Sequence, residues 1–436
     1  MARGQGWIGK LRSSLDDPDV VLDAEDEVDG LLPSVAVYPS TVEEVSHVLT
    51  FAWEEGLAIT PKGGGTALHL GNRPRRLDIL LCLSALKGGF EHSPEDMVAI
   101  VPAGMTVGET NEMLADRGQC LPLDPPRPDE ATVGGVLAAS SLGPRMQWFG
   151  PLRDSVLGLR VVLPDGRAVK TGGRVVKNVA GYDMAKLYVG SLGTLGIIVE
   201  VAFKLRPLFK VTTSLLFPFP TLDGAVRTSD DLLEAGLQPL ALTVLNSRAA
   251  SALNLGTGTA CLLVEFGDLK QVVERQVREA EGAARVRGSE DSLIHHGEES
   301  RKLWQSVRDA PVSPWDVTFR GSVPLAEVDA FLDATEETLK SRGMECCLVA
   351  HTGLGIVFVS PLSRPKDEAM ESIYAELTAL CTSLGGNLVL ERAPADLKDT
   401  LDVWGPRPPG FDLMSRVKAE FDAKGILNPG RFVGGL

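Results

Sequence analysis

The sequence predicts an α+β protein with two principal domains. Between Pro39 and Leu205, strand-like and helix-like segments alternate and are separated by glycine-rich loops. After Arg206-Pro207 glycine becomes rarer, and a β-α-β-β-α-β order of elements occurs twice. A chain of 436 residues is long enough for more than one hydrophobic core. These observations favour a second domain built from antiparallel sheets that helices cover on one face.

The first domain is expected to begin with a well-capped helix. Ser40-Thr41 followed by Glu43-Glu44 forms a capping box, the helix runs through Trp53, and Gly56 stands where a C-terminal glycine cap is expected. A strand over 57–60 then enters the glycine-rich stretch that follows. The other elements expected in this half are strands near 79–83, 97–101, 158–163 and 197–205 and helices at 106–116 and 132–140.

The second domain is expected to repeat one arrangement of elements. Its hydrophobic patterns predict strands at 212–217, 241–245, 260–266, 318–323, 346–351, 356–360 and 387–390, and helices at 222–235, 269–283, 325–341 and 367–383. The last stretch, 411–436, is a helix followed by a turn-rich tail at Gly425–Gly430.

Composition excludes several classes of function. With 43 Lys and Arg against 58 Asp and Glu, the net charge is −15, which disfavours binding to nucleic acid through phosphates. The six cysteines form no Cys-x-x-Cys pair, so we predict buried small residues and no zinc site, iron–sulfur cluster or disulfide framework. Neither a signal peptide nor an apolar run of membrane-spanning length is found, which predicts a cytoplasmic location.

The first glycine-rich loop, Pro61–Thr66, directly follows a strand. Gly63-Gly64-Gly65 allows consecutive backbone N–H groups to turn around an anion without interference from Cβ atoms. A diphosphate cradle and a plain tight turn both remain open for this loop alone. A Walker A loop is excluded because no Gly-Lys-Ser/Thr follows, and the sequence lacks a Gly-x-Gly-x-x-Gly motif after a strand.

Two further glycine-rich segments suggest the same ligand. The segment Pro125–Gly135 leads into a helix N-terminus lined by small residues, where an anion or close helix packing would both fit. A third region comprises Lys177–Asp183 and Gly190–Ile198, whose glycine spacing suits neither a helix nor a regular strand. Together the loops predict one elongated ligand that contains a diphosphate.

The succession of motifs resembles a known domain. Pro-Lys-Gly-Gly-Gly-Thr, Ala-Thr-Val-Gly-Gly, Pro-Leu-Arg-Asp-Ser-Val-Leu-Gly, Asn-Val-Ala-Gly-Tyr-Asp and Gly-Ser-Leu-Gly-Thr-Leu-Gly-Ile-Ile occur in the order typical of the FAD-binding domain of the vanillyl-alcohol oxidase and p-cresol methylhydroxylase (PCMH-type) flavoproteins. Within that superfamily, Lys177–Asp183 and the tail Lys424–Phe432 most resemble the FAD-binding E subunits of bacterial glycolate oxidases. The resemblance covers about residues 35–210.

The resemblance implies a domain plan. An acidic extension would occupy 1–34, a two-lobed PCMH-type FAD-binding domain 35–207, and an α+β cap domain 208–410. The helix and tail at 411–436 would return to the FAD domain. FAD would be bound non-covalently, because His69, the one histidine near the first loop, is poorly spaced for attachment to the flavin. The cofactor-binding residues implied are Pro61, Lys62, Gly63, Gly64, Gly65, Thr66, Ala67, Pro125, Ala131, Thr132, Gly134, Gly135, Ala138, Arg153, Asp154, Gly190, Gly193, Gly196, Ile197 and Ile198.

A substrate site is predicted less clearly. Oxidation of a 2-hydroxy acid needs a cation for the carboxylate and a base for the hydroxyl proton, which makes Arg320, His351 and Arg392 the catalytic candidates. For the arginines, structural ion pairs are an equal alternative. Competent relatives carry His-Gly-Asp-Gly-Asn-x-His, whereas 351–357 here read His-Thr-Gly-Leu-Gly-Ile-Val. A metal at His295-His296 with Glu298-Glu299 is disfavoured against an exposed polar loop.

These features predict an FAD-binding subunit of a glycolate oxidase complex. The resemblance implies two partners, a related catalytic flavoprotein subunit that oxidises glycolate to glyoxylate and an iron–sulfur subunit that takes the electrons. Attachment at the inner face of the cytoplasmic membrane would depend on these partners. The alternatives are a self-sufficient FAD-dependent dehydrogenase of D-lactate type and an interaction scaffold without cofactor.

Overall fold

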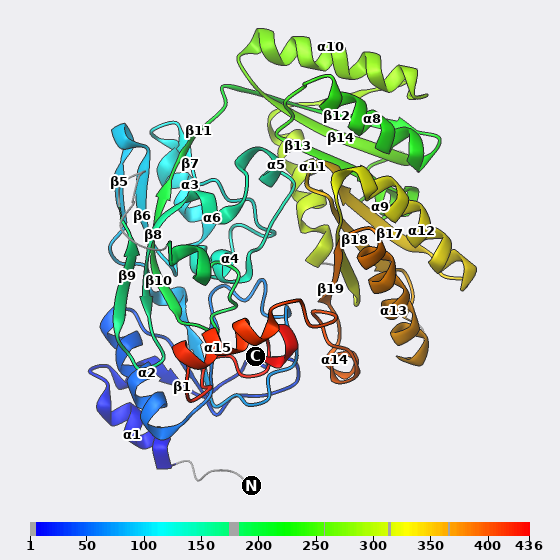
Figure 1. Ribbon diagram of the computed structural model, residues 1–436. Coiled ribbons are helices and arrows are strands. Elements are labelled where there is room, and N and C mark those ends of the chain that lie inside the picture. Colours follow the sequence, from blue (N-terminus) through cyan, green and yellow to red (C-terminus); the bar gives the residue numbers. More distant parts are fainter. Residues whose placement is uncertain (1–5, 174–182, 257, 313–314, 365–366) are drawn as a thin grey trace. The chain divides into compact units, whose positions relative to one another are not determined.

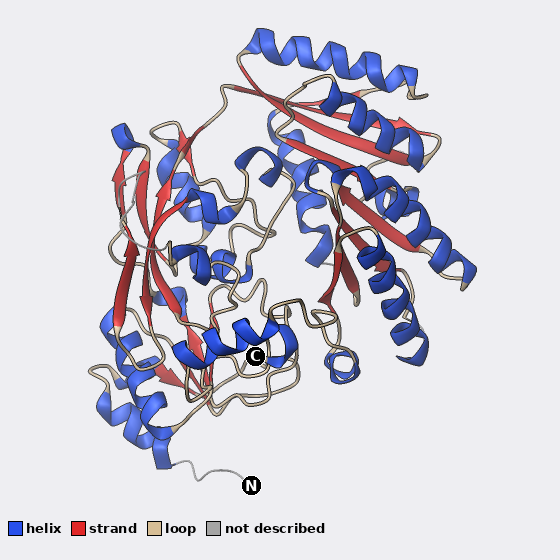
Figure 2. Ribbon diagram, in the orientation of Figure 1, coloured by secondary structure: helices blue, strands red, loops and turns tan. Residues whose placement is uncertain are grey.

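The protein divides into two compact units. The computed structural model describes residues 6–173, 183–256, 258–312, 315–364 and 367–436. Unit 1 comprises Met1–Leu142, Pro151–Leu208 and Pro406–Leu436, and unit 2 comprises Gly143–Gly150 and Phe209–Gly405. Each unit combines helices with sheets (Figure 2).

Unit 1 contains two larger sheets, and Figure 1 labels every strand of the second. The first is four-stranded with a parallel centre. Its order is β1 (Val21–Leu22), β2 (Val35–Val37), β4 (Ile79–Cys82) and β3 (Ile59–Lys62). β2 and β3 both run parallel to β4, and the crossover between β2 and β3 is the helix α2 (Val42–Glu55). The carboxyl ends of these three strands therefore meet at one edge, where ligands bind in open α/β sheets.

The second sheet of unit 1 is antiparallel. Its order is β5 (Glu91–Ser93), β6 (Val98–Pro102), β10 (Ile197–Lys204), β8 (Val156–Val162) and β9 (Ala168–Gly172), and β7 (Gln119–Cys120) pairs separately with β11 (Arg206–Pro207). The helices of unit 1, besides α2, are α1 (Gly6–Ser14), α3 (Val107–Ala115), α4 (Val133–Ala139), α6 (Leu152–Ser155), α7 (Ala185–Tyr188) and α15 (Phe411–Phe421). The two sheets reproduce the two-lobed arrangement expected for the first domain.

The predicted helix caps of unit 1 are present. Thr41 accepts a hydrogen bond from the Glu44 N–H at 3.1 Å, and the Glu44 carboxylate accepts from the Thr41 N–H in return. Gly56 ends α2 in the left-handed conformation with φ +65°. Thr132 caps α4, which the sequence predicted at 132–140. Local sequence therefore determines where these helices begin and end.

Both termini of unit 1 enter its core. Trp7 and Leu11 of α1 are 8% and 0% exposed, and Ile426 and Leu427 of the tail are 1% and 0% exposed in the same apolar cluster. The backbone of Ile426 accepts a hydrogen bond from the Ile59 N–H at 2.8 Å. Residues 6–34, within the segment expected as an extension, thus contribute buried apolar surface to this unit.

Unit 2 is built on one eight-stranded antiparallel sheet. Its order is β15 (Leu293–His295), β12 (Val211–Phe219), β14 (Ala260–Asp268), β13 (Ala241–Leu245), β17 (Cys346–His351), β18 (Ile356–Pro361), β16 (Thr318–Ser322) and β19 (Asn387–Arg392). The two rounds of the repeated order join where β13 pairs with β17. The expected antiparallel sheets are therefore a single continuous sheet.

Helices cover both faces of this sheet, whereas the sequence predicted one covered face. A Cβ atom on Gly321 would lie 2.6 Å from Phe331 of α12, so the α12 side is one face. Ser214 and its register partner Glu265 lie on the other face of the sheet. Trp304 of α11 donates to Ser214 at 2.8 Å, so α11 packs on this second face. The helices of unit 2 are α5 (Met146–Phe149), α8 (Leu222–Glu234), α9 (Ser247–Ala252), α10 (Lys270–Val286), α11 (Gly297–Asp309), α12 (Val328–Ser341), α13 (Asp367–Ser383) and α14 (Ala395–Thr400).

A short excursion of the chain accounts for a difference from the expected domain boundary. Residues 143–150 lie between two segments of unit 1 but belong to unit 2. Arg145 donates from Nε and Nη2 to the two carboxylate oxygens of Glu265 at 2.7 Å each, and Glu265 is fully buried. A bidentate bond to a buried carboxylate is strong enough to hold this segment against unit 2.

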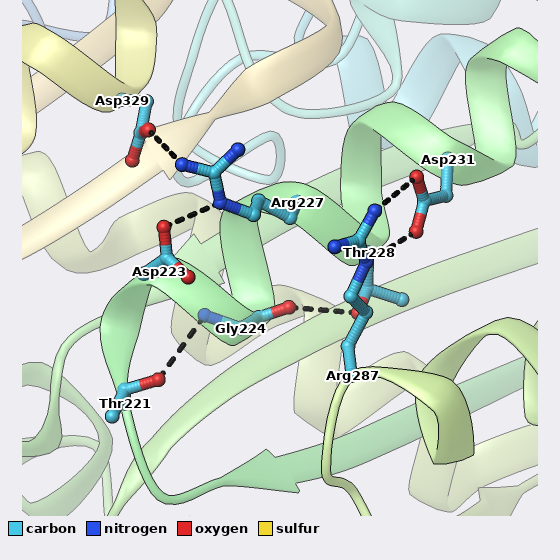
Figure 3. Close-up of polar contacts among 8 residues, drawn as sticks. All are labelled: Thr221, Asp223, Gly224, Arg227, Thr228, Asp231, Arg287 and Asp329. Atoms are coloured by element: carbon cyan, nitrogen blue, oxygen red, sulfur yellow. Dashed lines mark hydrogen bonds and ion pairs between the residues drawn. The ribbon is translucent and has the colours of Figure 1, made fainter.

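Ion pairs join α8 to its neighbours (Figure 3). Arg227 lies between Asp223, at 2.6 Å, and Asp329 of α12, at 3.6 Å. Arg287, just beyond α10, forms two bonds of 2.7 and 2.9 Å with Asp231. Both arginines are partly exposed, so we attribute to them a modest contribution to helix packing.

The stretch around His295 differs from its prediction as an exposed polar loop. His295 ends β15, and α11 begins at Gly297 with Glu298 and Glu299 in its first turn. His295 Nδ1 lies 3.7 Å from Glu299 Oε2. Among the described residues no group of three metal-ligating side chains occurs.

No helix in the described part of the chain has both the length and the apolar character needed to cross a membrane.

Candidate cofactor site

The glycine-rich segments of unit 1 surround one cavity. We call them loop 1 (Pro61–Ala67), loop 2 (Pro125–Gly135) and loop 3 (Gly190–Ile198). The cavity encloses about 730 Å³ of empty space including its opening, a size typical of ligand sites. It is lined by Pro61, Lys62, Gly63, Gly64, Gly65, Thr66, Ala67, Leu68, Leu83, Ala103, Thr132, Gly134, Gly135, Ala138, Ala139, Leu192, Gly193, Gly196, Ile197, Ile198, Asn428 and Arg431.

Loops 1 and 2 touch through their backbones. A Cβ atom on Gly64 would lie 1.7 Å from the carbonyl oxygen of Glu130, and one on Gly63 would lie 1.9 Å from Thr132 Oγ1. Neither position can carry a side chain without a shift of the neighbouring loop. Loop 1 therefore presents backbone to the cavity, as a cradle for a diphosphate requires.

Loop 3 closes against both other loops. A Cβ atom on Gly193 would lie 2.6 Å from Cγ of Pro61 in loop 1. The Leu192 N–H donates to the Ala138 carbonyl at 2.8 Å, just beyond loop 2. Leu192 adopts φ +51°, a conformation that costs a residue with a side chain about 1 kcal/mol or more. Surrounding contacts must therefore hold this strained residue in place.

Asn428 in the tail supplies such a contact. Its side-chain Nδ2 donates to the Leu192 carbonyl at 2.5 Å. Its backbone N–H donates to the Ile59 carbonyl at 2.8 Å, on the strand that enters loop 1. Asn428 thus links loops 1 and 3, and it also lines the cavity. The sequence predicted a turn-rich tail at Gly425–Gly430 but gave no signal that Asn428 belongs to the site.

Arg431 holds the exit of loop 1. It is 2% exposed, and Nη2 donates to the carbonyl oxygens of Leu68 and Leu70 at 2.5 and 2.6 Å. Burial lowers the pKa of Arg431 to about 10, so it remains charged at neutral pH. A buried cation among the cavity-lining residues suits an anionic ligand.

A buried ion pair fixes the tail to loop 3. Lys418 Nζ lies 2.6 Å from Asp422 Oδ2 and also donates to the carbonyl of Thr194 at 2.8 Å and of Leu427 at 2.9 Å. Asp422 is 2% exposed and accepts from the backbone N–H of Leu427 at 2.8 Å. The ammonium group of Lys418 and the carboxylate of Asp422 therefore have hydrogen-bond partners in addition to each other. These partners offset the cost of burying two charges.

Several predicted cofactor residues are absent from the lining of this cavity. Pro125 and Ala131 are buried, and the Ala131 carbonyl accepts from the Val107 N–H at 2.9 Å. Arg153 and Asp154 are exposed on α6. Gly190 also lies outside the lining and instead borders an apolar hollow beside α15. His69, which was not predicted to bind the flavin, is likewise absent from the lining. The residues from Lys177 to Tyr182 lie outside the described part of the chain.

Two of the catalytic candidates of unit 2, Arg320 and His351, share one face of its sheet. Arg320, Phe358 and Val349 are register partners on three neighbouring strands, so their side chains point the same way. His351 lies two residues beyond Val349 on that face, and its ring stands edge-on to Phe358 at 5.7 Å between centroids. Arg392 pairs with Thr318, two residues before Arg320, but the register shifts between Thr318 and Phe319, so strand alternation does not assign its face.

Arg320 and His351 both make polar contacts with other residues of unit 2. Arg320 donates from Nε to Glu391 Oε2 at 2.7 Å, with both side chains about one-fifth exposed (20% and 18%). His351 is 1% exposed, and its Nδ1 lies 3.0 Å from Thr243 Oγ1. The ion pair is the structural alternative that the sequence left open for Arg320.

The buried imidazole predicts a dependence of stability on pH. Burial lowers the pKa of His351 to about 3 from its ordinary 6.5. As the pH falls below 6.5, the unfolded chain takes up a proton that the folded chain refuses, so stability decreases until about pH 3. This group is expected to cost about 2 kcal/mol at pH 5 relative to pH 7. Urea unfolding at both pH values measures the cost.

The variant His351→Asn is the control for that measurement. It keeps a polar atom for Thr243 and has no titrating group, so most of the difference assigned to His351 should disappear. An unchanged pH dependence in the variant would show that other residues cause it.

Comparison with known proteins places this geometry in context. The family profile described as "FAD binding domain" matches residues 33–172, and "FAD linked oxidases, C-terminal domain" matches residues 208–432. Glycolate oxidase subunit GlcD of Bacillus subtilis is 30% identical, over 92% of this chain and 89% of its own length. D-lactate dehydrogenase of Archaeoglobus fulgidus is 31% identical, over 92% of this chain and 91% of its own length.

Solved structures show the same fold. p-Cresol methylhydroxylase with substrate bound has a TM-score of 0.78 at 16% identity and covers 99% of this chain and 97% of its own. Alkyldihydroxyacetonephosphate synthase has a TM-score of 0.73 at 19% identity and covers 98% of this chain and 85% of its own. The PCMH-type fold expected from the glycine-rich motifs is thereby confirmed.

Proposed function

Because the chain belongs to the FAD-linked oxidase family and uses FAD as its cofactor, we propose that it is the FAD-binding subunit of a glycolate oxidase-type complex. In this proposal the complex oxidises glycolate to glyoxylate, and electrons pass to an iron–sulfur subunit. A related catalytic flavoprotein is the other partner. The complex would lie in the cytoplasm, with any contact to the membrane made by its partners.

We place FAD in the cavity between loops 1, 2 and 3. The observation that supports this placement is the backbone cradle at Gly63 and Gly64, where a Cβ atom would collide with loop 2. Bound FAD supplies a hydride acceptor for oxidation of a 2-hydroxy acid. Loop 1 would bind the diphosphate through backbone N–H groups, and Thr132 would position the N-terminus of α4 beside it. Attachment would be non-covalent.

The contacts that Arg320 and His351 make within the protein support the proposal that this chain is an accessory subunit. A substrate carboxylate needs an available cation, but Arg320 is paired with Glu391. A general base must exchange protons near neutral pH, but His351 is buried and its pKa is lowered to about 3. In addition, the stretch after His351 lacks the carboxylate and the second histidine of competent relatives. Turnover of substrate is therefore assigned to a partner subunit.

The alternative is a self-sufficient D-2-hydroxy-acid dehydrogenase. It is favoured by similarity to D-lactate dehydrogenases along nearly the whole chain, including the protein of Archaeoglobus fulgidus. In that case the pairs at Arg320 and His351 would have to rearrange to receive substrate. A scaffold without cofactor is the third possibility and predicts a colourless protein.

Anaerobic mixing of the purified chain with glycolate or D-lactate distinguishes these functions. We expect a yellow protein whose oxidised flavin spectrum is unchanged by either acid, while dithionite reduces the flavin as a control. Bleaching of the flavin by one equivalent of substrate would support the dehydrogenase instead. Purification from native cells is expected to yield a second flavoprotein and an iron–sulfur protein with this chain. Their absence would contradict the complex.

A further inference from the structure

A carboxylate from the acidic N-terminal segment pairs with a lysine that lines the cofactor cavity. Lys62, in loop 1, forms an ion pair with Asp26 through its Nζ. The lysine side chain is 20% exposed and that of Asp26 is 48% exposed. Lys62 runs alongside the glycines of the loop, since a Cβ atom on Gly65 would lie 3.2 Å from Lys62 Cε. The cation that loop 1 contributes to the cavity is thus already partnered by a residue from 1–34.

The ion pair lies where parallel strands end. Lys62 is the register partner of Cys82, and Tyr38 directly follows β2, the other neighbour of β4. Burial raises the pKa of Tyr38 to about 12 and also raises that of the Cys82 thiol. Both strand-end neighbours are therefore uncharged at neutral pH. Neither side chain carries a negative charge that could pair with Lys62 in place of Asp26.

Packing holds Asp26 in position. Val28, two residues later, is 1% exposed and packs with Ala36 and Leu80 of the sheet. Val28 and Leu31 exchange backbone hydrogen bonds of 2.9 and 3.0 Å. This turn anchors the chain two residues after Asp26 and so limits how far its carboxylate can move from Lys62.

We propose that Asp26 tunes the affinity for FAD by holding Lys62 in an ion pair and so limiting its attraction for the diphosphate. The inference rests on the placement of FAD at loops 1, 2 and 3. A diphosphate in the cradle competes with Asp26 for the same ammonium group. Neutralising Asp26 removes this competition. FAD then binds more tightly, and its affinity depends more steeply on salt.

Titration of the apoprotein with FAD tests this role. Asp26→Asn is expected to lower the Kd for FAD on the order of threefold to fivefold, the scale of one partly exposed ion pair. Glu27→Gln is the matched control, because it makes the same change in net charge at an exposed neighbour and should leave the Kd unchanged. In a Lys62→Met background, Asp26→Asn should lose its tightening effect, since the cation is gone. Quenching of FAD fluorescence measures each Kd.

Three outcomes would overturn the proposal. They are an equal or higher Kd for Asp26→Asn, the same tightening in Glu27→Gln, and a tightening that persists without Lys62. The variant Gly64→Ala separates this inference from the placement of FAD. If Gly64→Ala binds FAD as the wild type does, the site itself is misplaced. If Gly64→Ala loses FAD and Asp26→Asn shows no tightening, only the role of Asp26 is refuted.

Discussion

Gly64→Ala is expected to remove FAD from the purified protein while leaving most of the fold intact. The added methyl group would lie 1.7 Å from the carbonyl oxygen of Glu130, so loops 1 and 2 must separate. Overpacking of this kind costs about 1–3 kcal/mol, which corresponds to a loss of FAD affinity on the order of tenfold to a hundredfold. The flavin content after purification and the Kd for FAD both measure this loss.

Gly88→Ala is the matched control for that experiment. No atom lies within 4 Å of the position of its Cβ, so flavin content and thermal stability should match the wild type. Circular dichroism of the apoproteins establishes whether Gly64→Ala still folds. A folded Gly64→Ala protein with the flavin content of the wild type would refute the cradle.

Arg431→Met is expected to weaken both FAD binding and the stability of unit 1. The substitution leaves the carbonyl oxygens of Leu68 and Leu70 without the guanidinium that reaches them at 2.5 and 2.6 Å. Loss of a buried charged donor costs about 3 kcal/mol. We expect a decrease of this size in the free energy of unfolding and at least a tenfold rise in the Kd for FAD. Urea unfolding and FAD titration measure the two quantities.

Two further variants test whether Arg431 positions the cofactor loops or only stabilises unit 1. Arg416→Met makes the same change in charge on the exposed side of α15 and should affect neither quantity. Arg431→Lys retains a cation that can reach one carbonyl, so it should recover part of the FAD affinity. If Arg431→Met lost stability but kept the wild-type Kd for FAD, the tail would support the core without positioning the cofactor loops.

The local sequence was sufficient to predict the capped helices and loop 1. The capping signals around Thr41 and Gly56 act within a single helix turn, so their outcome depends little on the rest of the fold. Three consecutive glycines after a strand are equally local evidence. The predicted strands of both halves also appear close to their expected bounds, because alternation and β-branched content are properties of short segments.

Contacts between distant segments could not be predicted in this way. Asn428 and Arg431 reach the cavity from the far end of the chain, and no periodic pattern marks which loop a tail residue will meet. The excursion of 143–150 into unit 2 depends on the bond from Arg145 to Glu265, residues separated by 120 positions. The start of helix α11 was missed because two histidines precede it and two glutamates stand in its first turn, which suggested a polar loop.

The glycine-rich loops alone predicted a ligand that contains a diphosphate, because close backbone approach demands glycine at specific positions. Their order along the chain carried the family resemblance that implied the fold and the FAD cofactor. The folded structure was needed to show which side chains engage one another across the chain. It pairs Asp26 with Lys62, Arg320 with Glu391 and His351 with Thr243. Such pairs form when packing brings separate elements together, and their burial then determines which charged or titrating groups remain available to a ligand.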